Sequence, residues 1–339
     1  MAESLSVKYR PQDFESVAGQ RSVIRILERM CEKKEYPHAM LFAGASGCGK
    51  TTMARILASK INGNLNGLEE MDAASNNGVD NIRNIIKSAQ ERSVSSKYKI
   101  FLIDECHALT GAAWQALLKS IEEPPEFTIF MLCTTDPQKI PQTIINRCQR
   151  YNISKISTDK IIDRLRFICN KEGFTNFEES IQYIAKISDG GMRLAISTLE
   201  KVASFSTDIT IENTLEALGN YSYTMFFKLV NDIIDSKSDE VLKTVSDIYY
   251  KGNDLKVFVD QFFSFCLDVT KYCLFKSTDL IEIPNSQEEA LKLSTNFDSA
   301  EKYYMVIVDK LFELKHKIKN ETAVRTTVEA SFLNMARWE

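Results

Sequence analysis

The stretch from residue 44 to residue 51 constrains the fold more than any other part of the chain. It reads Gly-Ala-Ser-Gly-Cys-Gly-Lys-Thr and matches the pattern G-x-x-x-x-G-K-[S/T]. The glycines of this pattern let backbone N–H groups face phosphate oxygens, and the loop joins a strand to a helix N-terminus. An apolar run at 40–43 precedes it, and a helical sequence starts at Thr52. Because a chance glycine-rich turn would not meet all these conditions, the sequence predicts a nucleoside triphosphate site.

The loop ends in a cation and a hydroxyl that suit bound triphosphate. Lys50 can reach the β- and γ-phosphates, and the Thr51 hydroxyl can bind Mg²⁺. The expected nucleotide contacts are Gly44, Ala45, Ser46, Gly47, Cys48, Gly49, Lys50, Thr51 and Thr52. The ligands predicted from this loop are therefore a nucleoside triphosphate and Mg²⁺.

A pair of acids supplies the second element of such a site. Asp104 and Glu105 follow the apolar run at 100–103, which has the pattern of a buried strand. At the carboxyl end of a strand, the first acid can help to hold Mg²⁺ and the second can polarise the attacking water. Acidic pairs also cap helices, but their place after a fully apolar strand favours a role in hydrolysis.

The composition describes an ordinary globular protein without a basic coat. The 339 residues are 44% hydrophobic and 26% charged, with a formal net charge of −4. Any contact with nucleic acid must therefore come from a local surface. No run has the length of a membrane span, and the polar residues 1–4 do not resemble a signal peptide. The eight cysteines form no C-x-x-C pair, which argues against a zinc ribbon and favours reduced thiols in the cytoplasm.

The hydrophobic pattern changes along the chain. Up to about residue 157, helix-like faces alternate with strand-like runs such as 127–133, which is typical of a parallel sheet covered by helices on both faces. Later the pattern is helical, with long helices expected at 255–275 and 303–317 and a connection with at most a short helix at 276–299. We therefore predict three domains. They are an α/β domain at 1–157, a small helical domain at 158–218 and an all-α domain at 219–339.

Two further positions are weak signals when taken alone. The strand at 127–133 ends in Thr134 and Thr135, where a hydroxyl would lie between the strands that carry the two motifs. Threonine is, however, common in strands. A short helix predicted at 141–145 is followed by Arg147, and an arginine at such a place more often interacts only with solvent.

Several longer motifs resemble one family of proteins. The motifs are Lys8-Tyr9-Arg10-Pro11-x-x-Phe14-x-x-Val17-x-Gly19-Gln20, Asp72-Ala73-Ala74-Ser75-Asn76-Asn77-Gly78-Val79-Asp80, Leu117-Leu118-Lys119-x-x-Glu122-Glu123-Pro124-Pro125, Thr134-Thr135-Asp136-Pro137-x-Lys139-Ile140-Pro141 and Asn146-Arg147-Cys148. Together they closely resemble the gamma/tau-type clamp-loader ATPases of bacterial DNA polymerase III. The strong similarity covers about residues 5–200, and the remainder is similar only in its helical pattern and its length.

The resemblance implies an AAA+ ATPase domain, a helical lid and a collar that joins other clamp-loader subunits in a five-membered ring. Such a ring uses ATP and Mg²⁺ to open a sliding clamp and load it onto primer-template DNA. The resemblance also assigns roles to single residues. It implies that Thr135 is the first sensor and Arg193 the second, that Arg147 is an arginine finger for a neighbour's ATP, and that Val17 and its surroundings hold the adenine.

The resemblance also points to two helix starts as contacts for DNA phosphates. Amides at a helix N-terminus can bind phosphates without reading the base sequence. The residues implied are Asn77, Gly78, Arg83, Gly111 and Lys119.

The sequence departs from the family pattern at several places. Residues 61–70 form a short loop without the family's four-cysteine module, so no zinc is expected. Asn146 stands where serine is usual, which leaves the finger arginine intact, and Leu194 stands where an acid is usual after the second sensor. The C-terminal domains of tau-type members are not expected in this chain.

Three alternatives compete with this interpretation. Residues 104–107 spell the Asp-Glu-Cys-His box of one helicase superfamily, but the helical C-terminal half lacks the second motor domain that helicases need. A ring subunit that binds nucleotide without hydrolysing it is disfavoured by the complete set of Lys50, Thr51, Asp104, Glu105 and Arg147. Another AAA+ remodeller, such as a branch-migration motor, is disfavoured by the Asn-Arg-Cys triplet and the Glu-Pro-Pro box.

Overall fold

The structure is a computed structural model that describes residues 3–278, 280–284 and 287–337. The chain divides into two compact units, which are Met1–Ile168 with Ser188–Ser197, and Cys169–Ile187 with Thr198–Glu339. The limits of these units differ from those of the three predicted domains, which stay a prediction.

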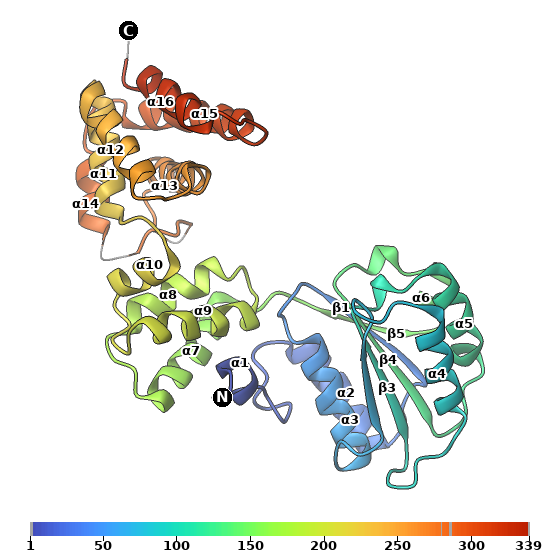
Figure 1. The fold of residues 1–339 in the computed structure, drawn as a ribbon. Helices are drawn as coiled ribbons and strands as arrows, with labels where there is room; N and C mark the ends of the chain where they lie inside the picture. Colours follow the sequence, from blue (N-terminus) through green and yellow to red (C-terminus); the bar gives the residue numbers. More distant parts are fainter. Residues whose placement is uncertain (1–2, 279, 285–286, 338–339) are drawn as a thin grey trace. The chain divides into compact units, whose positions relative to one another are not determined.

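The first unit is built on a parallel sheet with the strand order β2-β3-β4-β1-β5 (Figure 1). Its strands are β1 (Ala39–Gly44), β2 (Leu68–Asp72), β3 (Lys99–Asp104), β4 (Thr128–Thr134) and β5 (Gln149–Ile153). The three central strands are buried along almost their whole length, which explains their continuous apolar sequences. The predicted strands at 40–43, 100–103 and 127–133 correspond to β1, β3 and β4.

Helices flank both faces of this sheet (Figure 1). They are α2 (Arg21–Lys33), α3 (Lys50–Asn62), α4 (Val79–Ala89), α5 (Gly111–Glu122) and α6 (Gln142–Ile145), with 3₁₀ turns η1 (Cys106–Ala108) and η2 (Pro137–Lys139). The short α1 (Leu5–Lys8) belongs to the same unit and has no buried residue. Helices α7 (Thr158–Glu172) and α9 (Met192–Phe205) contribute their first parts to the same unit.

Successive residues of a strand point to opposite faces, and each face has its own core. Phe42 of β1 packs in the same cluster as Leu57 of α3. Leu41, its neighbour in β1, packs in the cluster that contains Trp114 of α5. All four side chains are almost completely buried. The sheet is therefore covered on both sides, which confirms the predicted α/β fold.

The second unit is helical. Its remaining helices are α8 (Glu178–Ile187), α10 (Ile211–Leu218), α11 (Tyr223–Ile234), α12 (Ser238–Tyr250), α13 (Leu255–Phe275), α14 (Glu288–Ser294), α15 (Ala300–Ile318) and α16 (Val324–Met335). The helix predicted at 255–275 agrees with α13, and the one predicted at 303–317 lies within α15. The predicted connection at 276–299 contains only the short α14, although residues 279, 285 and 286 of it lie outside the described residues.

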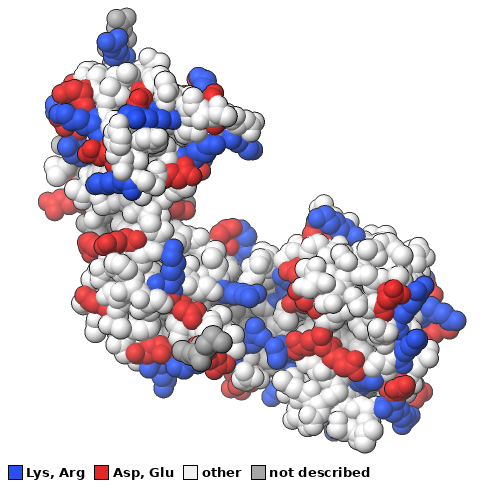
Figure 2. All heavy atoms as spheres, in the orientation of Figure 1, with Lys and Arg blue, Asp and Glu red and all other residues white. Residues whose placement is uncertain are grey.

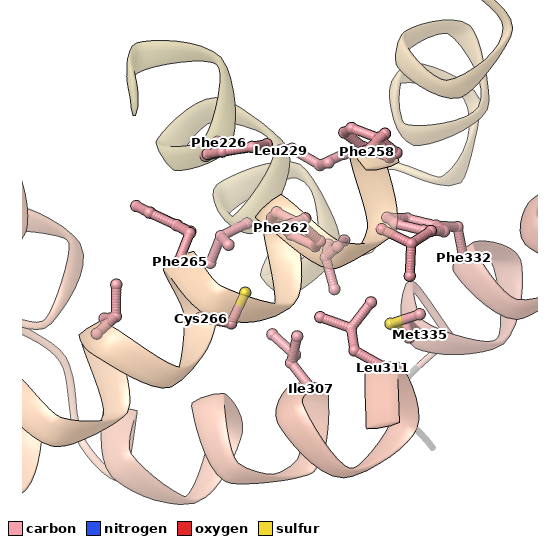
Figure 3. Close-up of a cluster of buried hydrophobic side chains, with 14 of the residues drawn as sticks. Phe226, Leu229, Phe258, Phe262, Phe265, Cys266, Ile307, Leu311, Phe332 and Met335 are labelled. Carbon is pink, nitrogen blue, oxygen red and sulfur yellow. The ribbon is translucent and has the colours of Figure 1, made fainter. Parts of the chain in front are cut away.

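Aromatic side chains of α13 form the centre of this helical core (Figure 3). The rings of Phe258 and Phe262, one turn apart on α13, stack with their centroids 6.0 Å apart. The ring centroid of Phe226 in α11 lies 5.3 Å from that of Phe265 in α13. Pairs of this kind contribute roughly 0.5–1.5 kcal/mol each beyond the area they bury. None of the helices in the described part of the chain has the length and apolarity needed to cross a membrane.

Candidate active site

The phosphate-binding loop lies between β1 and α3. Gly47 and Gly49 have φ angles of 72° and 104°, which side chains with a Cβ rarely adopt. A Cβ on Gly44 would overlap the carbonyl oxygen of Ile153 in the neighbouring β5. Helix α3 begins at Lys50, two residues before the start at Thr52 that the sequence predicts. Lys50 therefore lies in its first turn. The loop therefore has the strand–loop–helix context that its sequence requires.

The cation of the loop and the expected metal ligands are close together. Lys50 is only 5% exposed, and its Nζ donates to the carbonyl oxygen of Ala45 at 2.9 Å. The Thr51 hydroxyl donates to Oδ2 of Asp104 at 2.7 Å, and the other carboxylate oxygen accepts from the Glu105 N–H at 2.9 Å. The sequence places Thr51 and Asp104 in different motifs, and the fold brings them into contact.

These oxygens suit a magnesium ion that is shared with phosphates. Magnesium usually takes one or two protein ligands together with water and substrate phosphate oxygens. The Thr51 hydroxyl and the Asp104 carboxylate would serve as such ligands, and they contact each other directly. No group of three or more His, Cys, Asp or Glu that could hold a metal occurs among the residues described.

Glu105 projects from the end of β3 toward the end of the adjacent β4. Its φ angle is 45°, an uncommon value for a residue with a Cβ. Its Oε2 accepts from the Thr135 hydroxyl at 2.9 Å and from the Thr135 N–H at 3.3 Å. Because β4 lies between β1 and β3, Thr135 follows the strand between the two motifs, as expected from the sequence. The hydroxyl of Thr135 thus contacts the acid that is predicted to act on water.

His107 joins this group and was not predicted. Its Nδ1 lies 3.3 Å from Oε2 of Glu105 and 3.2 Å from the hydroxyl of Thr134. Thr134 is fully buried and also accepts from the Asp136 N–H at 3.0 Å. In the sequence, the only signal for His107 is its place in the helicase-like Asp-Glu-Cys-His box at 104–107. The structure makes it a neighbour of the catalytic candidate Glu105.

A pocket with an empty volume of about 990 Å³, including its open mouth, is lined by Lys50, Thr51, Asp104 and Glu105. Its wall has an apolar part formed by Val17, Ala18, Ile156, Met192 and Ile196. An apolar wall beside a phosphate loop suits the face of a nucleotide base. Val17, which is predicted to hold the adenine, lines this pocket, and its role stays a prediction.

The pocket also has a basic part beyond Lys50. Arg193 lines it, and its backbone N–H donates to the Gly47 carbonyl at 3.4 Å, so the predicted second sensor lies against the phosphate loop. Arg10 and Arg164 line it too. Burial, followed by the nearby Arg55, lowers the pKa of Arg10, and burial lowers the pKa of Arg164.

The sequence does not indicate Arg10 and Arg164 as site residues, although Arg10 belongs to the N-terminal motif at 8–20. Arg164 donates to the Tyr9 carbonyl at 2.6 Å and so ties the N-terminal motif to α7. No local pattern in the sequence connects these two positions. The N-terminal motif was the available signal for Arg10.

The cysteine of the loop is not a reactive group. Cys48 is 1% exposed, its thiol donates to the Ala45 carbonyl, and burial raises its pKa. A thiol with a raised pKa forms little of the nucleophilic thiolate. Cys48 therefore contributes shape and backbone to the loop.

Arg147 lies away from this pocket and is absent from the described residues that line it. It follows α6, and its guanidinium contacts Glu122 at the end of α5 through Nη2 and Oε1, 2.5 Å apart. The side chain of Arg147 is 39% exposed. Arg147 therefore lies outside the nucleotide pocket of its own chain, and its action on another chain stays a prediction.

The two helix starts that were expected to contact DNA lie side by side. Gly78 is the N-cap of α4, and Thr110, the N-cap of α5, donates its N–H to the Asn77 carbonyl at 3.2 Å. A Cβ added at Gly78 or Gly111 would meet no atom of another part of the chain within 4 Å.

The charged residues expected to contact DNA from these helices, Arg83 and Lys119, show no feature that marks them as such contacts. Arg83 pairs with Asp80 at 2.9 Å, and Lys119 is exposed in the last turn of α5. On the face shown in Figure 2, basic and acidic residues are interspersed, and no large area of one sign is visible. Binding of DNA by these residues stays a prediction.

Two family profiles match the chain. The one described as "DNA polymerase III, delta subunit" matches residues 68–157, and the one described as "DNA polymerase III subunits gamma and tau domain III" matches residues 209–301. The first match covers β2 to β5 of the first unit, and the second covers helices of the second unit.

Curated relatives agree with the profiles. The DNA polymerase III subunit tau of Bacillus subtilis is 38% identical over 280 residues, which are 76% of this chain and 50% of that protein. The DNA polymerase III subunit gamma of Buchnera aphidicola subsp. Schizaphis graminum is 30% identical over 317 residues, 86% of this chain and 87% of that protein. The chain thus spans about half the length of the tau relative and most of the gamma relative.

Solved structures support the fold. RuvB from Thermotoga maritima, described as a Holliday junction branch migration motor, superposes with a TM-score of 0.53 and 19% identity over 73% of this chain and 86% of that one. At this identity the likeness concerns the fold, which is of the AAA+ type, and not the function. The profiles and the gamma relative together show that this chain belongs to the DNA polymerase III gamma/tau family.

Proposed function

We propose that this chain is an ATP-hydrolysing subunit of a sliding-clamp loader. The observation that carries the proposal is the convergence of Lys50, the Thr51–Asp104 pair and Glu105 in one pocket. These groups come from different strands and motifs, and together they can bind phosphates, bind a metal and activate water. Membership of the gamma/tau family supports the clamp loader as the setting.

The proposed chemistry assigns one task to each group. The N–H groups of residues 44–49 and the ammonium of Lys50 hold the phosphates, and Thr51 and Asp104 hold Mg²⁺. When bound, Mg²⁺ would neutralise charge on the phosphates. Glu105 orients the attacking water, and Thr135 and His107 keep its carboxylate at the sheet edge. The adenine lies against Val17, and Arg193 senses the phosphates from the start of α9.

The proposed assembly is a five-membered ring with other clamp-loader subunits in the cytoplasm. In it, residues 158–218 act as the lid and residues 219–339 as the collar. ATP binding prepares the ring to open a sliding clamp, and contact with primer-template DNA triggers hydrolysis. Arg147 acts on the ATP of the adjacent subunit, because it lies outside the pocket of its own chain.

The non-hydrolysing ring subunit and the branch-migration motor receive less support than this function. A subunit that binds ATP without hydrolysing it would not need Glu105 beside Thr135 and the metal ligands. A branch-migration motor shares the fold, but family membership favours replication, and the similarity to RuvB concerns the fold alone.

The test is the substitution Glu105→Gln, which removes the charge that orients water and keeps the size of the side chain. The variant should bind ATP normally, lose turnover and stay on the clamp with ATP bound. Glu126→Gln, at an exposed position outside the pocket, is the matched control. Binding can be followed with a fluorescent ATP analogue, turnover by phosphate release and clamp retention by co-elution. Unchanged turnover in Glu105→Gln would mean that another group activates the water.

A further inference from the structure

Two contacts within its own chain hold the guanidinium of Arg147. Nη2 lies 2.5 Å from Oε1 of Glu122, and Nη1 donates to the carbonyl oxygen of Thr143 at 2.7 Å. Glu122 is the last residue of α5, and Thr143 lies in α6, which packs against α5. One contact therefore comes from each of two packed helices, and both act on the same planar group.

The geometry of these contacts leaves the arginine able to act. A guanidinium has five N–H donors in a rigid plane, and the two contacts use one donor on each terminal nitrogen. The Nε–H and the second hydrogen of each terminal nitrogen remain. Arg147 can therefore keep both contacts while it donates to a phosphate of another chain.

The contact with Glu122 has little to do with stability. The side chains of Arg147 and Glu122 are 39% and 36% exposed, and ion pairs exposed to this degree usually contribute little to the free energy of unfolding. The carboxylate does, however, fix the orientation of a long side chain that would otherwise sample many rotamers. A fixed side chain loses less conformational freedom when it binds its target.

We propose that Glu122 is a positioning residue for Arg147 and holds its guanidinium in the orientation that meets the ATP of the adjacent subunit. The proposal rests on the proposed role of Arg147 as an arginine finger. Glu122 acts only through Arg147 and makes no contact with the nucleotide of its own chain, because it does not line that pocket. Glu122 belongs to the motif at 117–125, which gives it no role of its own.

The first experiment compares Glu122→Ala with Glu123→Ala in the assembled loader with clamp and primer-template DNA. Glu123 is the adjacent acid, is exposed, and forms no ion pair within the described part of the chain. Glu122→Ala should lower kcat for ATP by up to about tenfold, as expected for one side chain that must be immobilised. The KM for ATP, the ATP affinity of the isolated chain and its melting temperature should not change. Glu123→Ala should behave as the wild type.

The second experiment adds Arg147→Ala and the double variant, because coupling between two positions shows whether one acts through the other. Glu122→Ala should have no further effect once Arg147 is absent. Equal losses in both backgrounds, an unchanged or raised kcat in Glu122→Ala, or a loss that comes with a lower melting temperature would each overturn the positioning role.

The same variants separate the two proposals. If Arg147→Ala lowers hydrolysis and Glu122→Ala does not, only the role of Glu122 fails. If Arg147→Ala hydrolyses ATP normally, the finger role fails and the role of Glu122 fails with it. If both variants lower kcat and the double variant equals Arg147→Ala, both roles stand.

Discussion

Replacement of Lys50 by alanine should weaken ATP binding by about two to four orders of magnitude. The ammonium group has three N–H donors, and one of them already donates to the Ala45 carbonyl. Two donors are then left for phosphate oxygens. A hydrogen bond with a charged partner contributes roughly 1.5–3 kcal/mol, so two contribute roughly 3–6 kcal/mol. Because about 1.4 kcal/mol corresponds to a tenfold change in Kd, the expected loss is about 10²- to 10⁴-fold.

The small exposed fraction of Lys50 supports the use of these hydrogen-bond free energies. At 5% exposure the ammonium is shielded from solvent, so water weakens its interaction with phosphate less than at the surface. The fold should tolerate the change, because Lys50 lies in the first turn of α3 and alanine is the best helix former. The circular-dichroism spectrum should therefore stay that of the wild type.

The assay is a titration of the isolated chain with a fluorescent ATP analogue in the presence of Mg²⁺. Lys60→Ala is the matched control, since it removes the same charge from the last turn of the same helix at an exposed position outside the pocket. If the Lys50→Ala and Lys60→Ala variants bound the analogue equally tightly, the assignment of residues 44–51 as a phosphate-binding loop would be refuted.

Three other predictions concern the finger, zinc and the helical core. Arg147→Ala should keep the ATP affinity of the lone chain and lower stimulated hydrolysis in the ring by roughly 10³-fold or less. Mixing it with Lys50→Ala chains, which still carry the finger, should restore part of the rate, and a loss of ATP binding by the monomer would contradict the in-trans role. Metal analysis after dialysis should find no stoichiometric zinc. Asp232 is 6% exposed, and its Oδ2 has no hydrogen-bond partner among the described residues. Asp232→Asn removes the charge from this buried group and should therefore raise the free energy of unfolding by about 1 kcal/mol in a urea titration. A lower midpoint of unfolding would count against this.

The parts of the fold that could be predicted are those with a strong local pattern. Strands β1, β3 and β4 are buried on both faces, so their sequences are continuous apolar runs. The edge strands β2 and β5 are largely exposed, and residues 68–72 and 149–153 are mostly polar, so no strand was predicted there. The start of α3 at Lys50 was also missed by two residues, because the turn of the loop passes directly into the helix.

In the candidate site, too, only the residues that belong to a local sequence motif could be predicted. Lys50, Thr51, Asp104 and Glu105 belong to motifs whose spacing along the chain carries the chemistry. The contact of Arg164 with Tyr9 joins residues 155 positions apart, and neither position has a pattern that indicates the other. Such contacts form only when the helices and strands pack, so a single sequence gives no direct signal for them.

The positions of the cations indicate how ATP binding and hydrolysis should differ between a single chain and an assembled ring. Lys50, Arg10 and Arg193 all line the pocket and are available to ATP in the ground state. A cation that binds ATP and the transition state equally well lowers KM without raising kcat. Arg147 is outside the pocket and is held by Glu122, so it can add a charge only where another chain presents its ATP. We therefore expect the lone chain to bind ATP well and hydrolyse it slowly, and the rate to rise when neighbouring chains bring a finger to each site.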